Sequence, residues 1–405
     1  MGNSEIHTGV DLNQMDTIAV PPRDRPAPKI NTLESIRGLA AMLVVIHHVP
    51  NWNSNLWDIR IIRNGYLMVD LFFVLSGFVI YKAYGSKLNS FGQLLRFQFL
   101  RFGRLYPIHL FFLAIFVLIE ISKYFAQNKY GVAMPNSAPF RESNWVALIE
   151  QIFLVQAIGP TGNSLTFNSA AWSISVEFYT YLIFAFTVLY ADKAKHILFA
   201  AFASVALALL LAKMTFGSTV MLRCIAGFFI GCLTATLAEK VKIRLHSALS
   251  VAVLLALILF LQFKSDYIFD PVIYLLSAAL ILTLVCSERG WLKSLLNLRV
   301  MTWLGTISYS VYMSQTMVVW IVNQVFRMVL KAPGLLRAGR ITPQLPLVEA
   351  AIGYVVVALC VLLVSQATYK LIEAPFRRKS RDLVFRGDSR VAASLGEGPK
   401  AFPPG

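Results

Sequence analysis

Arg37 and His48 are eleven residues apart in the segment ESIRGLAAMLVVIHHVP, which is otherwise strongly apolar. A helix advances about 100° per residue, so both side chains project from one face, with His48 about 16 Å further along the axis. Arg binds phosphate or carboxylate groups, and His exchanges a proton near neutral pH. The spacing indicates a polar path with an anion-binding group at one end and a candidate general base at the other. The simpler interpretation is that Arg37 reaches a membrane interface while His47 and His48 cap the helix.

Two carboxylates, Asp70 and Glu177, lie inside other apolar segments, MVDLFFVLSGFVIY and AAWSISVEFYTY. An ionisable group within a bilayer is costly and usually faces a cavity or a partner. A carboxylate beside His48 would position that residue as a general base, and either of the two can do so. The alternatives are that Asp70 caps a helix at the interface and that Glu177 forms a structural ion pair with Arg223.

A third group of polar residues is the basic segment SKLNSFGQLLRFQFLRFGRLYPIH. Arg101 and Arg104 are three residues apart, so their guanidinium groups are neighbours on a helix. Such a pair can bind a phosphate group with several charge-assisted hydrogen bonds. The alternative is that the segment binds anionic lipid headgroups at the membrane surface.

The elements that must position these residues are apolar helices. The chain has 405 residues, of which 57% are hydrophobic and 14% charged, and its mean hydropathy is +0.63. Apolar segments recur at close to the roughly 20 residues that cross a bilayer. We therefore predict an all-α, polytopic membrane helix bundle of about ten transmembrane helices. The predicted spans are 33–49, 66–84, 105–121, 171–190, 195–211, 218–237, 248–263, 271–285, 303–325 and 347–371.

The distribution of charge predicts the topology. The net charge of +16 is carried mainly by segments on one side of the predicted spans. Lys and Arg accumulate on the cytoplasmic side of membrane proteins, so we predict that both termini are cytoplasmic. The excess of basic residues is then explained by membrane topology. We expect the lipid bilayer as a partner and expect no nucleic acid. A shorter apolar segment, 145–158, is predicted to be an interfacial or re-entrant helix on the outer side.

The two ends of the chain differ from the apolar region between them. Residues 1–30 include PPRDRPAPK and are predicted to be a disordered cytoplasmic tail. Residues 31–380 form the predicted transmembrane domain, and 381–405 a polar cytoplasmic tail. The tails lack the pattern of a signal peptide and are too short for a further catalytic domain. The four cysteines lie in apolar segments without metal-ligand spacing, so no metal site is predicted.

Six motifs, in this order, resemble the acyltransferase 3 family of integral membrane acyltransferases, over about residues 31 to 380. They are RGLAAMLVVIHH (Arg37, His48), VDLFFVLSGFVIY (Asp70, Ser76, Gly77), RFGRLYP (Arg101, Arg104), WSISVEFY (Trp172, Ser173, Ser175, Glu177), LGTISYSVYMSQ (Gly305, Ser308, Tyr309, Tyr312, Gln315) and YKLIEAPFRR (Glu373, Pro375). Many members of that family have His at the position of Gln315. Because Gln cannot take up a proton at neutral pH, we expect this residue to affect the choice of acceptor rather than to act as a base.

The resemblance implies transfer of an acyl group, with acetyl favoured, from cytoplasmic acyl-CoA to a hydroxyl of a carbohydrate or glycoconjugate. O-antigen, exopolysaccharide, peptidoglycan, a lipid-linked oligosaccharide and a glycosylated small molecule are all candidate acceptors. No bound cofactor is expected, because acyl-CoA is the donor substrate. A bacterial inner membrane is the expected location.

The expected site residues combine the spacing arguments with the resemblance. The catalytic candidates are His48, Arg37, Asp70 and Glu177. The substrate-binding candidates are Arg101, Arg104, Ser76, Trp172, Ser173, Tyr309 and Gln315. His48 is expected to act as general base on the acceptor hydroxyl, and an acyl-His intermediate is the alternative. The same intramembrane charges would also suit a multi-pass permease or a lipid-linked sugar flippase, although no internal repeat is evident.

Overall fold

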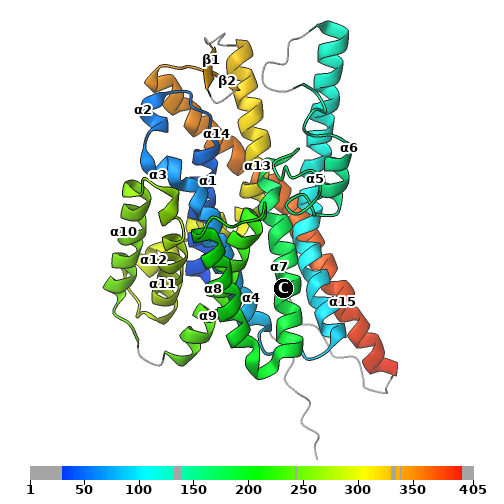
Figure 1. Cartoon of the computed structure of the whole chain (residues 1–405), viewed down its shortest axis with the longest axis vertical. Coiled ribbons are helices and arrows are strands. Elements are labelled where there is room, and N and C mark those ends of the chain that lie inside the picture. Colours follow the sequence, from blue (N-terminus) through cyan, green and yellow to red (C-terminus); the bar gives the residue numbers. More distant parts are fainter. Residues whose placement is uncertain (1–29, 132–137, 242–243, 330–333, 338–339, 395–405) are drawn as a thin grey trace, which may run out of the picture.

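The computed structural model describes residues 30–131, 138–241, 244–329, 334–337 and 340–394, and these are almost entirely helical (Figure 1). The first half contains α1 (Asn31–His48), α2 (Ser54–Trp57), α3 (Arg60–Arg63), the 3-10 turn η1 (Asn64–Leu67), α4 (Met68–Tyr84), α5 (Phe91–Tyr130), α6 (Trp145–Ile152), η2 (Ser169–Ala171) and α7 (Trp172–Ala191). The second half contains η3 (Asp192–Ala194), α8 (Lys195–Leu211), α9 (Thr219–Lys240), α10 (Ser247–Phe263), η4 (Tyr267–Phe269), α11 (Val272–Cys286), α12 (Trp291–Leu296), α13 (Arg299–Val329), β1 (Gly334–Arg337), β2 (Arg340–Pro343), α14 (Leu347–Thr368), the π-helix η5 (Tyr369–Glu373) and α15 (Ala374–Ser394).

Each of the ten predicted spans falls largely within helical structure, which confirms the all-α class. Within the described ranges, six helical segments are long and apolar enough to cross a membrane: Arg60–Tyr84, Phe91–Tyr130, Ser169–Leu211, Thr219–Lys240, Tyr267–Cys286 and Leu347–Val384. The protein is therefore a membrane protein. Its ten crossings and the cytoplasmic position of its termini stay predictions. The predicted tail at 1–29 lies outside the described residues, and Arg381 lies within α15.

Helix α14 illustrates how these helices meet two apolar environments. Val357 and Val361 are fully buried against the bundle. Leu359 and Leu363 lie on the opposite face with 56% and 71% of their surface exposed. A helix that is apolar on all sides is expected where one face packs on protein and the other faces lipid.

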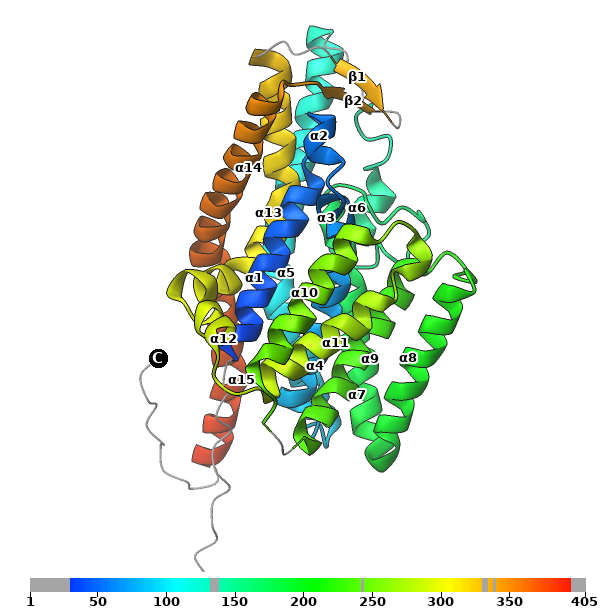
Figure 2. The same cartoon turned by 90° about the vertical axis from the view of Figure 1, so that its left-hand side faces the viewer.

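Helices α1 and α13 pack closely and run parallel inside the bundle (Figure 2). A Cβ atom added to Gly38 would lie 2.7 Å from the backbone nitrogen of Gly305, so only small residues permit this approach. Beyond the end of α1, the Trp52 indole Nε1 donates to Asn323 Oδ1 at 2.9 Å. These two contacts set the register of the pair, and by interpolation the residues of α13 near Gln315 lie level with His48.

Helices α4 and α9 make a second close contact, also through glycine. A Cβ atom on Gly77 would lie 1.8 Å from the carbonyl oxygen of Phe228, and one on Gly231 would lie 2.1 Å from that of Val74. The close approach leaves no room for a side chain at either glycine. It brings Arg223 of α9 alongside Asp70 of α4.

Helix α5 is one continuous helix of 40 residues, about 60 Å long, and is longer than the roughly 30 Å hydrocarbon core of a bilayer. The basic segment before the predicted third span is therefore helical and continuous with that span. Alongside α5 runs α15, and a Cβ atom on Gly103 would lie 1.9 Å from Ser380 Oγ (Figure 1). At the opposite end of the molecule, β1 and β2 form an antiparallel hairpin in which Gly334 pairs with Pro343.

Candidate active site

A cavity of about 90 Å³ lies between α1, α4, α5, α7 and α13. We call it the arginine cavity. Its polar lining consists of Arg37, Ser76, Arg101, Arg104, Ser173, Glu177, Tyr181, Ser308, Tyr309 and Tyr312. Seven predicted site residues are thus brought together from five helices: Arg37, Ser76, Arg101, Arg104, Ser173, Glu177 and Tyr309. The cavity is small for a whole nucleotide and suits a narrow chain, because pockets that enclose complete cofactors are several times larger.

The three arginines of the cavity differ in the groups that compensate their positive charges. Arg37 donates to Glu34 of its own helix at 3.1 Å, and 16% of its side chain is exposed. Arg101 lies 5.6 Å from the centre of the Tyr84 ring, and its buried Nε–H has no hydrogen-bond partner among the described residues. Arg104 interacts electrostatically with Glu34, Glu177 and Glu373. A buried guanidinium with an unused donor is costly unless an anion binds there.

Glu177 is the acceptor at the centre of a small hydrogen-bonded group. Ser76 Oγ and the Tyr181 hydroxyl both donate to Glu177 Oε1 at 2.5 Å, and they lie 2.8 Å from each other. Ser76 comes from α4, whereas Tyr181 follows Glu177 by one helical turn on α7 and so lies on the same face. Tyr181 was not among the predicted site residues, although this spacing was visible in the sequence.

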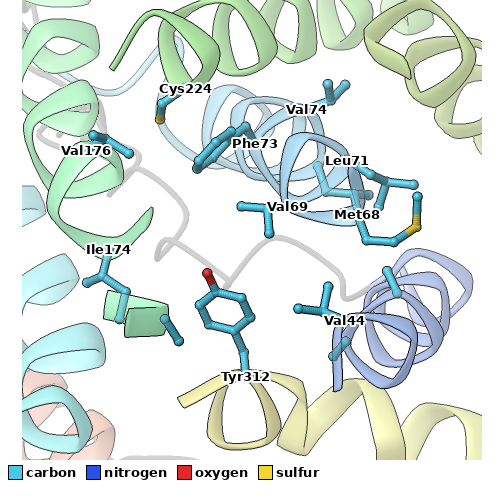
Figure 3. Packing of buried hydrophobic residues seen from close by; sticks show 14 of the residues in the cluster. Val44, Met68, Val69, Leu71, Phe73, Val74, Ile174, Val176, Cys224 and Tyr312 are labelled. Carbon is cyan, nitrogen blue, oxygen red and sulfur yellow. The ribbon is translucent and has the colours of Figure 1, made fainter. Parts of the chain in front are cut away.

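The opposite end of the cavity carries neutral hydroxyl groups. Ser173 Oγ donates to the Tyr312 hydroxyl at 2.9 Å. Figure 3 shows the Tyr312 ring extending from α13 toward Val69 and Phe73 of α4. Tyr309 lies one turn before Tyr312 on α13. Its hydroxyl donates to the Leu105 carbonyl of α5 at 2.6 Å and so links α13 to α5. Tyr312 therefore lines the cavity on the side toward the C-terminal half of α1, near Val44 (Figure 3).

His48 does not line the arginine cavity. Its Nδ1 lies 2.8 Å from the Val44 carbonyl oxygen, an acceptor, so Nδ1 carries the proton and Nε2 is the basic nitrogen. The expectation that Asp70 or Glu177 orients His48 is thus wrong, because a backbone carbonyl one turn below does so. His47 instead contacts α3, with Nδ1 3.0 Å from the Ile62 carbonyl oxygen, and its ring centre lies 5.9 Å from that of Tyr66 in η1.

Gln315 also lies outside the cavity lining, about one turn beyond Tyr312 on the same side of α13. It is fully buried. Neither its amide oxygen nor its amide nitrogen has a hydrogen-bond partner in the described part of the chain. Buried amides are normally paired, so this unpaired amide is an exception that marks Gln315 as a candidate for a binding role.

Asp70 belongs to a different group, the Asp70 cluster (Asp70, Arg223, Tyr274, Tyr66, Lys264 and Asp270), and Trp172 packs beside that group. Arg223 donates to both oxygens of Asp70, at 3.0 and 2.7 Å, and the Tyr274 hydroxyl donates to the same carboxylate at 3.0 Å. The centre of the Trp172 ring lies 5.3 Å from the Arg223 guanidinium. Arg223 therefore pairs with Asp70 rather than with Glu177, and the Asp70 carboxylate is engaged by Arg223 and Tyr274.

Comparison with known proteins agrees with these motifs. Residues 30–367 match the family described as "Acyltransferase domain", the acyltransferase 3 family. The chain belongs to this family. The predicted resemblance and the predicted enzyme class, an acyltransferase, are confirmed. No solved structure matches this acyltransferase significantly.

Curated relatives of this acyltransferase include three bacterial proteins. "O-acetyltransferase OatA" of Staphylococcus aureus is 24% identical over 380 residues, covering 86% of this chain and 57% of the relative. "Putative peptidoglycan O-acetyltransferase YrhL" of Bacillus subtilis is 25% identical over 330 residues, covering 69% and 47%. "Protein 2 in picA locus" of Rhizobium radiobacter is 40% identical over 101 residues, covering 24% and 50%. The chain spans about half the length of these relatives.

Proposed function

We propose that this acyltransferase moves an acyl group, with acetyl favoured, from cytoplasmic acyl-CoA to a hydroxyl of a carbohydrate or glycoconjugate. We further propose that it works in a bacterial inner membrane with both termini in the cytoplasm. Acetyl and carbohydrate are supported by the names of two relatives, an O-acetyltransferase and a putative peptidoglycan O-acetyltransferase. The chain shares only part of each relative's length, so the acceptor is a proposal for this chain alone.

The arginine cavity is the single observation that carries this proposal. Arg101 and Arg104 enter it from the first part of α5, and Arg37 from the second turn of α1. Both helices begin on the side of the bundle predicted to be cytoplasmic, where acyl-CoA is present. The three guanidinium groups would bind the donor's phosphates, because Arg pairs well with phosphate oxygens. The narrow arm of the donor would then extend along the cavity past Ser173 and Tyr312.

His48 is the proposed general base for the second half of the reaction. It lies about 16 Å beyond Arg37 on the same helix face, in the direction that the arm would take. Its Nε2 would accept the proton of the acceptor hydroxyl as that oxygen attacks the thioester carbonyl. The coenzyme A sulfur would leave with the electrons of the carbon–sulfur bond. Tyr312 lines the cavity on the side toward the C-terminal half of α1, which ends at His48, and we propose that its ring moves aside when the donor binds.

The test uses membranes that contain wild type, His48→Ala or the control His246→Asn, incubated with radiolabelled acetyl-CoA. His246 is exposed and caps α10, a role that Asn can retain. General base catalysis contributes about 10²–10⁴-fold, so His48→Ala should reduce label in the carbohydrate fraction by that factor while the control stays active. A folded His48→Ala protein with normal activity would contradict the role of His48. Absence of both label and coenzyme A binding in wild type would favour the permease or flippase.

A further inference from the structure

A fourth arginine, Arg377, lies beside the arginine cavity without lining it. It belongs to the first turn of α15, and 28% of its side chain is exposed. The close contact between Gly103 of α5 and Ser380 of α15 aligns the two helices side by side. Arg104 and Arg377 therefore stand next to each other, and Arg104 is the charge that acts most strongly on Arg377.

Two neighbouring guanidinium groups repel each other, and partial burial strengthens that repulsion. The carboxylate nearest to Arg377 is Glu373, whose Oε1 lies 3.6 Å from Arg377 Nη1, longer than a hydrogen bond. Glu373 is itself almost fully buried and accepts a hydrogen bond from Ser310 Oγ at 2.8 Å. Arg104 also interacts with Glu34 and Glu177. Among the described residues, four arginines (Arg37, Arg101, Arg104 and Arg377) therefore share three carboxylates (Glu34, Glu177 and Glu373), and the remaining positive charge is the arrangement expected of an anion site in the absence of its anion.

The backbone at this position is unusual as well. Residues Tyr369–Glu373 form a π-helix between α14 and α15. Such turns are rare, are often found at functional sites, and change the direction in which the following side chains project. Here the π-helix ends at Glu373, the hydrogen-bond partner of Ser310, and α15 begins at the next residue, three residues before Arg377.

We propose that Arg377, together with Arg104, binds the monoester phosphate on the ribose of the acyl-CoA donor. This inference rests on the proposed function, because it takes coenzyme A as the donor. In coenzyme A, the arm that carries the thioester is attached to the pyrophosphate, and the monoester phosphate lies on the ribose beyond it. When the arm occupies the cavity, the pyrophosphate lies at Arg101 inside it, and the monoester phosphate reaches Arg104 and the more exposed Arg377.

The same chemistry, a phosphate monoester on paired arginines, is also offered by an anionic lipid headgroup such as phosphatidic acid. The two sources predict different results. If the ligand is coenzyme A, the contribution of Arg377 to binding depends on the ribose phosphate. If the ligand is a lipid, replacement of Arg377 leaves coenzyme A binding unchanged and lowers binding of phosphatidic acid.

The experiment measures binding of coenzyme A and of 3′-dephospho-coenzyme A to the full-length protein in detergent, for wild type, Arg377→Met and Arg378→Met. Arg378 is the matched control, because it is the next residue on α15, is exposed, and loses the same charge when replaced. A lost charge-assisted hydrogen bond weakens binding by about 10- to 100-fold. Arg377→Met should therefore weaken coenzyme A binding by that factor and leave binding of the dephospho form unchanged, whereas Arg378→Met should change neither. Arg377→Lys should lie between wild type and Arg377→Met.

Three results would overturn the inference. Equal loss of affinity for both ligands would mean that Arg377 acts through the fold or through the pyrophosphate. Unchanged affinity for both would remove Arg377 from the donor site. Loss of phosphatidic acid binding alone, measured with vesicles containing that lipid, would assign the pair to the membrane surface. Failure of wild type to bind coenzyme A at all would instead refute the proposed function, so the two failures are distinguishable.

Discussion

Two groups of charged side chains lie inside this bundle, the arginine cavity and the Asp70 cluster. In the Asp70 cluster, Arg223 binds Asp70 through two hydrogen bonds. Lys264 lies 2.6 Å from Asp270, and the Tyr66 hydroxyl bridges the two by donating to Asp270 and accepting from Lys264. In the arginine cavity, by contrast, Arg101 keeps an unused buried donor, and Arg37, Arg104 and the neighbouring Arg377 share the carboxylates of Glu34, Glu177 and Glu373.

Whether a buried charge has a partner indicates its role, in stability or in ligand binding, better than its degree of burial does. Removing one partner of a fully paired buried ion pair is strongly destabilising, because the other charge is left buried without compensation. A buried charge that faces a void already carries an unmet desolvation cost, which a bound anion would offset. We therefore expect the Asp70 cluster to contribute to stability and the arginine cavity to contribute to ligand binding at the expense of stability.

The largest effect is expected from Asp70→Ala, which leaves Arg223 without its carboxylate. Breaking one side of a buried pair costs about 3–5 kcal/mol, so the apparent melting temperature of the purified protein should fall strongly. The measurement is thermal unfolding in detergent. The double variant Asp70→Ala/Arg223→Leu should recover part of the loss. An unchanged melting temperature for Asp70→Ala would remove the distinction between the two groups.

Arg101→Met is expected to have the opposite effect, which is weaker donor binding without a loss of stability. Loss of a charge-assisted contact should weaken acetyl-CoA binding by about 10- to 100-fold. Removal of a charge whose Nε–H is buried without a hydrogen-bond partner among the described residues should leave the melting temperature equal or higher. Titration calorimetry and thermal unfolding test the two halves. The control is Arg96→Met, an exposed position on the same helix with the same loss of charge. A variant that binds the donor normally would show that Arg101 has no ligand role.

Tyr66→Phe should give the smallest change. It removes the hydroxyl between Lys264 and Asp270, but the ion pair of those two residues remains. One hydrogen bond of this kind contributes about 1 kcal/mol, so a slightly lower melting temperature and unchanged acetyl-CoA affinity are expected. Tyr124→Phe, at a 49% exposed position, is the control for loss of a hydroxyl. A marked fall in acetyl-CoA affinity for Tyr66→Phe would mean that the Asp70 cluster takes part in donor binding.

Much of the helical organisation could be predicted, because a membrane-spanning helix is specified by local composition. Apolar segments of sufficient length locate the helices, and the eleven-residue spacing by itself places Arg37 and His48 on one face of α1. Predictions that require two helices to be placed against each other fare differently. The sequence predicts that Asp70 lies near His48, whereas the close packing of α4 on α9 places Asp70 beside Arg223.

The site residues that the sequence did not predict are those whose role depends on neighbours distant in the chain. Tyr181 joins the site because Ser76, 105 residues away, meets it across the α4–α7 contact. Arg377 lies in a basic segment near the end of the chain, and its position beside Arg104 follows from the contact of α5 with α15. Neither neighbour is implied by local sequence.

The sequence by itself determined that this is a helical membrane protein of the acyltransferase 3 family, because hydropathy and motif spacing are properties of short segments. It also determined which residue types are present at each position of those helices. Only the tertiary structure decided which charges meet. Helix rotation and depth are set by glycine contacts such as Gly38 with Gly305 and Gly77 with Phe228, and the partner of a buried charge changes when a helix turns by one residue. For this reason the arginine cavity and the Asp70 cluster, which both contain charged side chains inside the bundle, differ in which charges are left for a ligand.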